Sequence, residues 1–568
     1  MQRVALLILG VVAVTWLQFE FFPGHTYLQG ESQIYLPVLE RLDAPGYLSR
    51  DLVAAHPDVA YTIYDEVTLF LHEAGRLKFR TALEGQQLFC RAAAVTGALL
   101  LASSTGIGDL LAFLIATFVN LGAMLWGPAV LLIDREPVPR AFAFALILLA
   151  AGLLVQEKPL LAGLAGGTAL LYDPLTAAPF WGMAAVAFAG DARLRRLLRP
   201  ALTILVIFIL LLANLAQLQP GVVESTALMG KLSAPLAAVQ QYRTPNVWVS
   251  LWVPADIWSY LAIYVCGLWA TARIWQMLNR QLRWILLALP LAGILSVPVS
   301  YMALERLGWY LAPQIQPAQA LMFTLAFSSI ACGIAGARAA LARKKWEASL
   351  WFCVVFALPL NSRILNLLPL DLLRVTSGTN LLELAACFAL ALAVGITVSE
   401  WGQSRWRYTS LLVPVLAVLV IPHLADSHIV PEKDGQSMVQ LADWAEASTW
   451  GSSMFLFPDA GRDSDPGAFR ADSRRAVWVD WTSGALVDGL ESVAAEWWER
   501  WQQTMQGEFS AARLQNMLSL PVDYYVLKRS NRLEGVRPVF LNRRFIVYDA
   551  ADLRRAVAPL RLASTIRR

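Results

Sequence analysis

The sequence predicts a mainly α-helical polytopic membrane protein of about thirteen transmembrane helices, with a small C-terminal α/β domain. Hydrophobic residues make up 57% of the 568 residues and charged residues only 15%, and the mean hydropathy is +0.52. A soluble protein is rarely this apolar. Apolar runs of membrane-spanning length recur as far as residue 424, and a more polar composition follows. These observations predict a transmembrane domain over 1–424 and an α/β domain over 425–568.

The predicted spans follow from apolar runs between polar loops. The first run starts at Val4, after Met1-Gln2-Arg3, and has no small-residue cleavage site, which favours a retained span over a signal peptide. The candidate spans are 4–22, 89–106, 109–133, 141–156, 159–173, 175–190, 200–218, 257–275, 284–303, 312–337, 347–361, 379–399 and 409–424.

Clusters of Lys and Arg predict the topology. They fall in loops that follow even-numbered spans, at 191–200, 272–283, 337–345 and 401–407. Basic loops are typical of the cytoplasmic side, so we expect a cytoplasmic N-terminus in a bacterial-type plasma (inner) membrane. The loops 23–88 and 219–256 and the domain 425–568 are then extracytoplasmic. The net charge of +4 comes from these clusters and does not favour nucleic-acid binding.

The C-terminal domain shows alternating strand and helix patterns. Aromatic and β-branched residues predict strands at 453–458, 476–481, 523–529, 538–542 and 544–549. Apolar spacing predicts helices at 438–448 and 488–506. The expected order is helix, strand, strand, helix, strand and hairpin.

The cysteine and histidine patterns predict no structural metal site. The five cysteines are scattered singly, and "HEAGR" (72–76) lacks the second histidine of a zinc-hydrolase motif. Whether a catalytic metal binds is left unknown by these patterns.

The first external loop holds most polar groups with catalytic potential. It opens with "GESQIY", and a helix over 31–42 would place Glu31 and Tyr35 on one face, with Pro37 expected to kink it. Two interpretations of Glu31 stay open. It orients a metal ion or accepts a proton from an acceptor, or it only caps the helix start, where the helix dipole favours a negative charge.

This layout and its motifs resemble the GT-C glycosyltransferases, membrane enzymes that use polyprenyl-phosphate-linked sugars. Members include aminoarabinose transferases, protein O-mannosyltransferases and oligosaccharyltransferase catalytic subunits. Their first loop opens with an acidic pair and a Tyr four residues after its second member, which Glu31 and Tyr35 match. The small-residue span 159–188, with Tyr172-Asp173-Pro174, resembles another family feature.

The resemblance implies roles for particular residues. Glu31 would be the catalytic carboxylate. Gly30 stands where the first acid of the pair is expected, so Asp51 or the Asp65-Glu66 pair would supply a second carboxylate, with His56 beside Asp51 as a further candidate. A divalent metal is a possible cofactor of such a site, and no nucleotide motif is present.

Cationic side chains are needed to stabilise a departing phosphate. The candidates for substrate or phosphate binding are Tyr35, Arg50, Arg243, Arg306, Arg363 and Arg374. The alternative for each arginine is an interfacial side chain that reaches toward water. Likewise, "EWWERW" (496–501) has two interpretations, stacking on carbohydrate or packing within its own domain.

Three functions remain open from the sequence. The first is sugar transfer from a lipid-linked donor to an unknown glycan, lipid or protein acceptor of the cell envelope. The second is a transporter or flippase of lipid-linked intermediates, which the scarcity of charged residues in the spans disfavours. The third is a non-catalytic scaffold in envelope assembly. All three require membrane lipids as partners.

Overall fold

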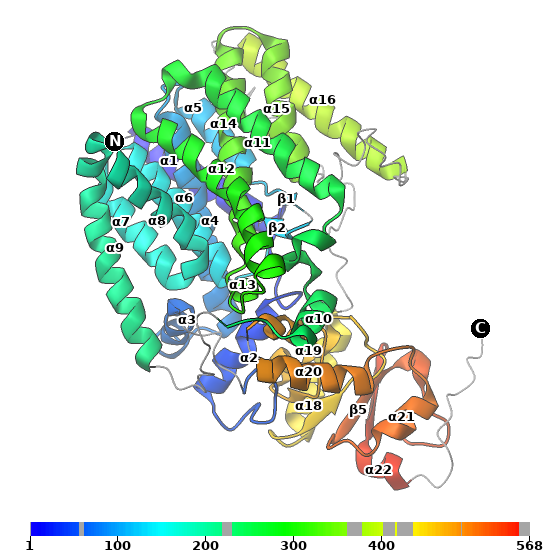
Figure 1. Cartoon of the computed structure of the whole chain (residues 1–568). Coiled ribbons are helices and arrows are strands. Elements are labelled where there is room, and N and C mark those ends of the chain that lie inside the picture. The colour runs from blue at the N-terminus through cyan, green and yellow to red at the C-terminus, as the bar shows by residue number, and fades with distance from the viewer. Residues whose placement is uncertain are drawn as a thin grey trace. The chain divides into compact units, whose positions relative to one another are not determined.

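A computed structural model of the chain describes residues 2–55, 62–125, 127–218, 230–360, 378–401, 415–416, 435–489 and 491–555. The chain divides into two compact units (Figure 1). The membrane unit comprises Met1–His25, Leu83–Gln217 and Pro245–His428. The polar unit comprises Thr26–Ala82, Leu218–Thr244 and Ile429–Arg568. Three segments distant in sequence therefore form each unit.

The membrane unit is built from helices that coincide with the predicted apolar runs. Prolines begin several of them, where the missing N–H is not needed. The helices are α1 (Gln2–Glu20), α4 (Phe79–Ser103), α5 (Asp109–Val119), α6 (Pro139–Val155), α7 (Pro159–Tyr172), α8 (Pro174–Gly190), α9 (Ala192–Leu218), α11 (Pro254–Ile274), α12 (Arg280–Ser300), α13 (Ala312–Ile315), α14 (Leu321–Leu341), α15 (Lys345–Leu360) and α16 (Gly378–Trp401).

Four segments of the described residues are long and apolar enough to cross a membrane, by length and composition. They are Ala192–Leu215, Asp256–Met277, Arg280–Arg306 and Ala312–Leu341, and shorter apolar helices accompany them. These segments support a multi-pass membrane protein. The count of thirteen spans and the direction of each span stay predictions, and the predicted span 409–424 lies almost wholly outside the described residues.

One predicted span, 109–133, is wrong in its extent. Helix α5 ends at Val119, and Asn120 donates its side-chain N–H to the Ala116 carbonyl. Gly122 then adopts a φ of +85°, which an L-residue rarely tolerates. The chain continues as a short antiparallel hairpin of β1 (Met124–Leu125) and β2 (Val130–Leu131). Apolar composition alone does not distinguish such a hairpin from the rest of a span.

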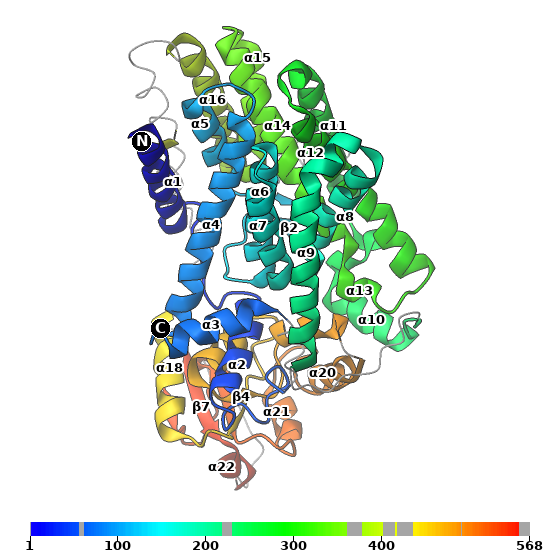
Figure 2. The same cartoon turned by 90° about the vertical axis from the view of Figure 1, so that its left-hand side faces the viewer.

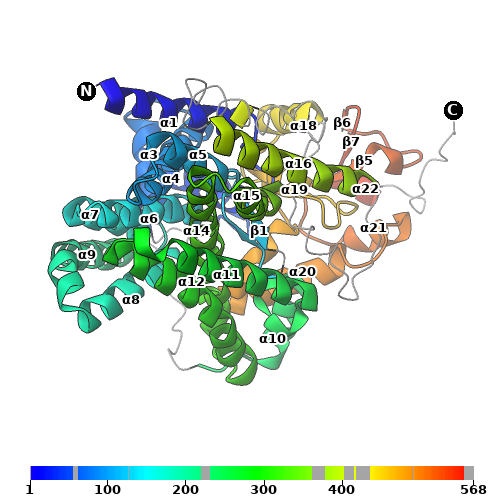
Figure 3. The ribbon, with the colours of Figure 1, turned by 90° about the horizontal axis from the view of Figure 1, so that it is seen from above.

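Small residues allow the membrane helices to approach closely. A Cβ at Gly97 would lie 2.3 Å from the backbone of Leu148, so α4 and α6 touch through their main chains, and they run side by side in Figure 2. A Cβ at Gly267 would lie 2.2 Å from the Ser328 hydroxyl oxygen, so this glycine makes room for the Ser328 side chain of α14. Helix α14 lies among α11, α12 and α15 in Figure 3, and its apolar window is fully buried. It forms the centre of this unit.

The polar unit contains a five-stranded mixed sheet in the order β4-β3-β5-β7-β6. All five predicted strands are confirmed, as are the two predicted helices. The strands are β3 (Met454–Leu456), β4 (Ala476–Val477), β5 (Tyr524–Lys528), β6 (Phe540–Leu541) and β7 (Phe545–Asp549). The helices are α2 (Ser32–Asp43), α3 (Ile63–Glu73), α10 (Ala234–Arg243), α18 (Gly435–Ser448), α19 (Asp465–Ser473), α20 (Glu491–Thr504), α21 (Ala511–Met517) and α22 (Ala550–Arg555).

Helix α19 was absent from the predicted order, and the strand pairing shows why it is needed. Strand β3 pairs in parallel with both β4 and β5. Parallel neighbours need a crossover connection, and α19 supplies it between β3 and β4. Phe469 of α19 is fully buried against Phe455 and Phe457, so this helix also closes the core of the domain.

Candidate functional site

The segment that leads into α2 is held by buried side chains next to Glu31. The backbone N–H of Leu28 donates to the Ser32 hydroxyl at 3.0 Å. The Gln33 amide donates to the Leu28 carbonyl at 2.6 Å and to the Ser464 carbonyl at 2.9 Å. Ser32 and Gln33 are both fully buried. The backbone at Glu31 is therefore fixed by two neighbours that face inward.

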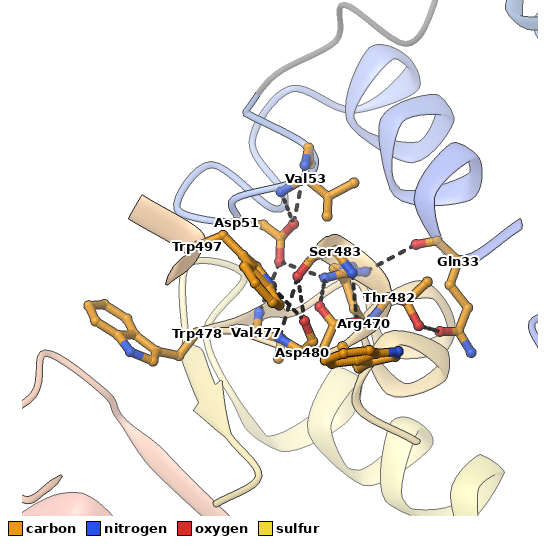
Figure 4. Close-up of polar contacts among 12 residues, drawn as sticks. Gln33, Asp51, Val53, Arg470, Val477, Trp478, Asp480, Thr482, Ser483 and Trp497 are labelled. Carbon is orange, nitrogen blue, oxygen red and sulfur yellow. Dashed lines mark hydrogen bonds and ion pairs between the residues drawn. The ribbon is translucent and has the colours of Figure 1, made fainter. Parts of the chain in front are cut away.

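A buried ionic network lies behind this segment (Figure 4). Arg470 donates to the Asp480 carboxylate at 2.8 Å and to the Gln33 carbonyl at 3.2 Å. Its Nη1 also lies 3.8 Å from the Asp51 carboxylate. The Asp51 carboxylate accepts the backbone N–H groups of Val53 at 2.9 Å and Val477 at 3.0 Å. Two carboxylates thus share one guanidinium in the interior.

Asp480 shapes the turn that follows β4. Its second carboxylate oxygen accepts the backbone N–H groups of Thr482 at 3.1 Å and Ser483 at 3.2 Å. The Thr482 hydroxyl donates to the Gln33 side-chain carbonyl at 2.9 Å, as Figure 4 shows. The network therefore ties the start of α2 to the turn that carries Trp481.

Arg243, the last residue of α10, joins this turn from a third segment. Its Nε donates to the Trp481 carbonyl at 2.7 Å, and its guanidinium lies 4.5 Å from the centre of the Trp481 ring. Burial lowers the pKa of Arg243, while nearby negative charges, Glu31 among them, act to raise it. The fold thus brings the predicted carboxylate Glu31 and the predicted phosphate ligand Arg243 within electrostatic reach of each other.

A second arginine, Arg462, lies on the same indole and was missed by sequence reasoning. Its guanidinium lies 4.4 Å from the Trp481 ring centre and 5.4 Å from that of Tyr242. Arg462 follows β3, and Trp481 follows β4, so both lie in loops at the carboxyl ends of parallel strands, where ligand sites gather. That signal becomes readable only once the strands are known to be parallel.

Tyr242 connects the two arginine-bearing segments. Burial opposes ionisation of Tyr242, but the hydrogen bonds from Arg462 and Trp501, together with the positive charge of Arg462, lower its pKa. Trp501 Nε1 lies 3.4 Å from the Tyr242 hydroxyl oxygen. The result is a half-exposed aromatic surface with two guanidinium groups against it.

The tryptophans of "EWWERW" separate into two roles. Trp497 and Trp501 are almost fully buried and stack at 5.3 Å, which supports packing within the domain. Trp498 is half-buried and lies 5.2 Å from the Tyr242 ring. Only Trp498 of the three keeps a surface on which a ligand can pack.

Glu31 occupies the N-cap position of α2, yet its side chain makes no capping hydrogen bond. Its backbone is already helical, with φ −68° and ψ −22°. The half-buried carboxylate is therefore not used to cap the helix, which weakens the capping interpretation. Tyr35, one turn later, packs its ring 5.3 Å from that of Tyr64 on α3.

The other carboxylate candidates lie in different surroundings. Asp51 is fully buried and occupied by the network described above. Asp65 is buried at the start of α3, and burial, together with a hydrogen bond and charge repulsion from neighbouring Glu66, raises its pKa to about 8. Arg50 is exposed and donates to the Asp523 carboxylate at 3.2 Å, so it forms a surface ion pair.

The remaining predicted residues lie in the membrane unit or outside the described residues. Arg306 belongs to the membrane unit, where its guanidinium lies 5.3 Å from the Tyr301 ring centre. His56, Arg363 and Arg374 lie outside the described residues. Within the described ranges, no group of three or more His, Cys, Asp and Glu side chains is arranged to hold a metal ion.

Asp488, which acts electrostatically on Arg243, should make the stability of the protein depend on pH. It is buried and accepts the Thr244 hydroxyl at 2.9 Å, and burial raises its pKa to about 7. Because the folded state keeps this proton while the unfolded chain loses it near pH 4, Asp488 lowers stability as the pH rises from about 4 through 7. Asp488→Asn should thus gain a few degrees of Tm over the wild type at pH 8, and little at pH 5.

Thermal unfolding of the detergent-solubilised protein between pH 5 and pH 8 checks this. Asp552→Asn, at a half-exposed carboxylate, is the control and should follow the wild type. A difference between Asp488→Asn and wild type that stayed constant with pH would contradict the assignment.

No protein-family model and no curated protein sequence matches the chain. Among solved structures, ArnT from Cupriavidus metallidurans in the apo state matches 97% of this chain and 98% of its own, with a TM-score of 0.41 and 13% identity. The arabinofuranosyltransferase AftD from Mycobacteria matches 96% of this chain and 40% of its own, with a TM-score of 0.43 and 12% identity. The chain is thus similar, over nearly its whole length and at low sequence identity, to two GT-C membrane glycosyltransferases, the group that its first-loop motif resembles.

Proposed function

We propose that the chain is a membrane glycosyltransferase that transfers a sugar from a polyprenyl-phosphate donor to an acceptor of the cell envelope, on the extracytoplasmic face. The observation that carries this proposal is that Glu31 lies within electrostatic reach of Arg243, whose Nε donates to the Trp481 carbonyl. A base for the acceptor and cations for a phosphate leaving group are the two functions that this transfer needs.

The chemistry assigns one role to each charge. An acceptor hydroxyl or amine attacks the anomeric carbon of the sugar, and the bond between that carbon and the phosphate oxygen breaks. Glu31 takes the proton that the acceptor loses. The polyprenyl phosphate leaves with the bonding electron pair, and Arg243 and Arg462 stabilise its charge. Asp51 and Arg470 do not touch the substrate in this scheme but hold the Glu31 segment in place.

The surroundings of the arginines support binding of a phosphate. Arg243 has its Nε committed to the Trp481 carbonyl, which fixes the plane of its guanidinium. Arg462 is exposed. Two like charges on one indole repel each other, as the lowering effect of Arg462 on the pKa of Arg243 indicates. An anion between them relieves this repulsion.

A transfer assay tests the proposal. The purified protein is placed in lipid vesicles with polyprenyl-phosphate-linked pentose or hexose, labelled in the sugar, and with an envelope extract as the acceptor. We expect label in a new covalent product and release of polyprenyl phosphate. Movement of the labelled lipid across the vesicle membrane without a product would instead indicate a transporter. If neither a product nor lipid movement is observed, the result indicates a scaffold.

Arg462→Ala should reduce kcat/KM in this assay by about 10- to 100-fold, as expected for the loss of one charge-assisted contact worth roughly 1.5–3 kcal/mol. Arg462→Lys should recover part of the loss, since it keeps the charge without the planar donor pattern. Arg529→Ala is the matched control, because the side chain of this exposed arginine donates to the Asn542 carbonyl of a neighbouring turn. Equal activity of Arg462→Ala and the control would remove Arg462 from the site.

A further inference from the structure

Helix α9 begins with a cluster of arginines on the surface of the membrane unit. Arg193, Arg196 and Arg199 recur at every third position of its first turns, and all three side chains are exposed. Residues three apart are neighbours on a helix surface, so these charges lie close to one another. None of the three side chains forms an ion pair or a hydrogen bond with another described residue. Their charges are therefore not paired within the part of the chain that the structure describes.

This end of the helix is an unfavourable place for positive charges. The backbone N–H groups at the start of a helix carry a partial positive charge, which repels cations. Like charges on neighbouring positions of a helix surface also destabilise it. Asp191, the residue before α9, accepts the backbone N–H of Arg193 at 2.9 Å, but its other oxygen accepts Arg280 at 2.5 Å. The charge of Asp191 is therefore already paired with an arginine of α12.

The fourth arginine of this stretch has a structural role. Arg195 donates through Nε to the Phe188 carbonyl at 2.9 Å and through Nη2 to the Ala189 carbonyl at 2.8 Å. It thus satisfies carbonyls at the C-terminus of α8, where a positive charge is favourable. No such contact in the described structure explains its three neighbours.

Other basic groups of the membrane unit are paired with carboxylates. Arg273 donates to the Glu347 carboxylate at 2.7 Å, and Lys344 lies 3.6 Å from the same carboxylate. Lys345 lies 3.8 Å from Glu400. These cations belong to two of the other predicted basic loops, whose positive charge is thus partly balanced within the chain. The arginines at the start of α9 differ from them in this respect.

The rest of α9 presents an apolar surface that continues from the arginines. Only 11% of its apolar window is buried within the protein, and Val206, Ile207 and Leu210 are exposed. The helix lies at the outer edge of the membrane unit in Figures 1 and 3. A molecule that covers α9 along its length must therefore offer an anionic group at one end and apolar chains along the rest. A phospholipid with an anionic headgroup combines both.

We propose that the start of α9 is a binding surface for anionic phospholipids, independently of the transfer activity proposed above. Phosphate oxygens of the headgroups accept N–H groups from Arg193, Arg196 and Arg199, and the acyl chains pack along the apolar surface of the helix. The negative headgroups offset the repulsion among the arginines and the unfavourable helix dipole. Free inorganic phosphate would supply the anion but not the chains.

Lipid-dependent stability of the full-length protein tests the proposal. The Tm of delipidated protein in neutral detergent is measured after addition of phosphatidylglycerol, phosphatidylcholine or inorganic phosphate. We expect phosphatidylglycerol to raise the Tm by several degrees more than phosphatidylcholine, because a ligand that binds the folded state stabilises it. Equal effects of the two lipids would overturn the proposal. A rise with inorganic phosphate that matches the rise with phosphatidylglycerol would also overturn it, since the lipid chains would then contribute nothing.

The triple variant Arg193→Gln/Arg196→Gln/Arg199→Gln locates the effect on α9. It should lose most of the excess rise in Tm that phosphatidylglycerol gives over phosphatidylcholine. In neutral detergent without phospholipid it should be at least as stable as the wild type, because it removes like charges from the start of a helix. A full excess in this variant would refute the site.

A matched control changes the net charge by the same amount elsewhere. Arg529→Gln/Arg532→Gln/Arg537→Gln replaces three exposed arginines of the polar unit and should keep the full excess. An equal loss in both triple variants would indicate general attraction of anionic lipids to the protein and would refute the α9 site. If the α9 triple variant fails to fold, Arg196→Gln takes its place, and a smaller excess than in the wild type is expected; an unchanged excess overturns the proposal.

Discussion

Glu31→Gln is expected to lower kcat for sugar transfer by about 10²- to 10⁴-fold, the usual contribution of a positioned general base. The amide has nearly the same shape as the carboxylate but cannot take the acceptor proton. Because the Glu31 side chain does not cap α2, the substitution should leave the start of the helix intact. The measurement is single-turnover transfer of labelled sugar, with thermal unfolding of the same preparation.

Glu73→Gln provides the matched control for this prediction. Glu73 lies at the exposed end of α3, in the same first loop, and should tolerate the change with full activity. Wild-type activity of Glu31→Gln would show that the base lies elsewhere, and the Asp65-Glu66 pair would be the next carboxylates to test. A parallel loss of Tm and activity would indicate a structural role for Glu31.

Asp51→Asn should destabilise the polar unit by about 3–5 kcal/mol, the range observed when one partner of a buried ion pair is removed. The asparagine side chain has only one acceptor oxygen, whereas Asp51 uses both oxygens to accept backbone N–H groups, from Val53 on one side and Val477 on the other. The amide N–H₂ would therefore face a backbone donor. Arg470 would also lose one of its two negative neighbours. Thermal or denaturant unfolding of the solubilised protein measures the loss.

Asp51→Asn also separates a structural role from a catalytic one. In our interpretation its activity falls only in proportion to the folded fraction, and conditions that stabilise the fold restore it. Arg470→Met should behave in the same way, since it leaves Asp51 and Asp480 buried without their shared cation. An Asp51→Asn protein with the wild-type Tm and no transfer activity would return Asp51 to the catalytic residues.

The sequence predicts those features that depend on neighbouring residues along the chain. Apolar runs located the helices of the membrane unit, and alternation located the strands, because each element buries a face that its own composition defines. The hairpin after Val119 was not predicted because it is as apolar as a transmembrane span. Helix α19 was not predicted because its apolar face is short. It is needed as a crossover only because β3 and β4 pair in parallel, which is a tertiary feature.

The candidate site was only partly predictable for the same reason. Glu31 and Arg243 were predicted from a motif and from the need for a cation, but no local pattern shows that Glu31 lies within electrostatic reach of Arg243. Arg462 sits among turn-forming residues in "PDAGRDSDPG" (458–467), where an arginine ordinarily indicates nothing more than a solvated loop. Its significance comes from the contacts with Trp481 and Tyr242, which are tertiary.

The bond from Arg470 to the Gln33 carbonyl has a consequence for the order of biosynthesis. These two residues are 437 positions apart, and Thr482 reaches the same glutamine across 449 positions. The segment that carries Glu31 and Gln33 is made among the first by the ribosome, yet its partners are among the last. A nascent chain therefore carries the carboxylate for most of its synthesis without the surroundings that orient it, and the site forms only after translation has passed Ser483.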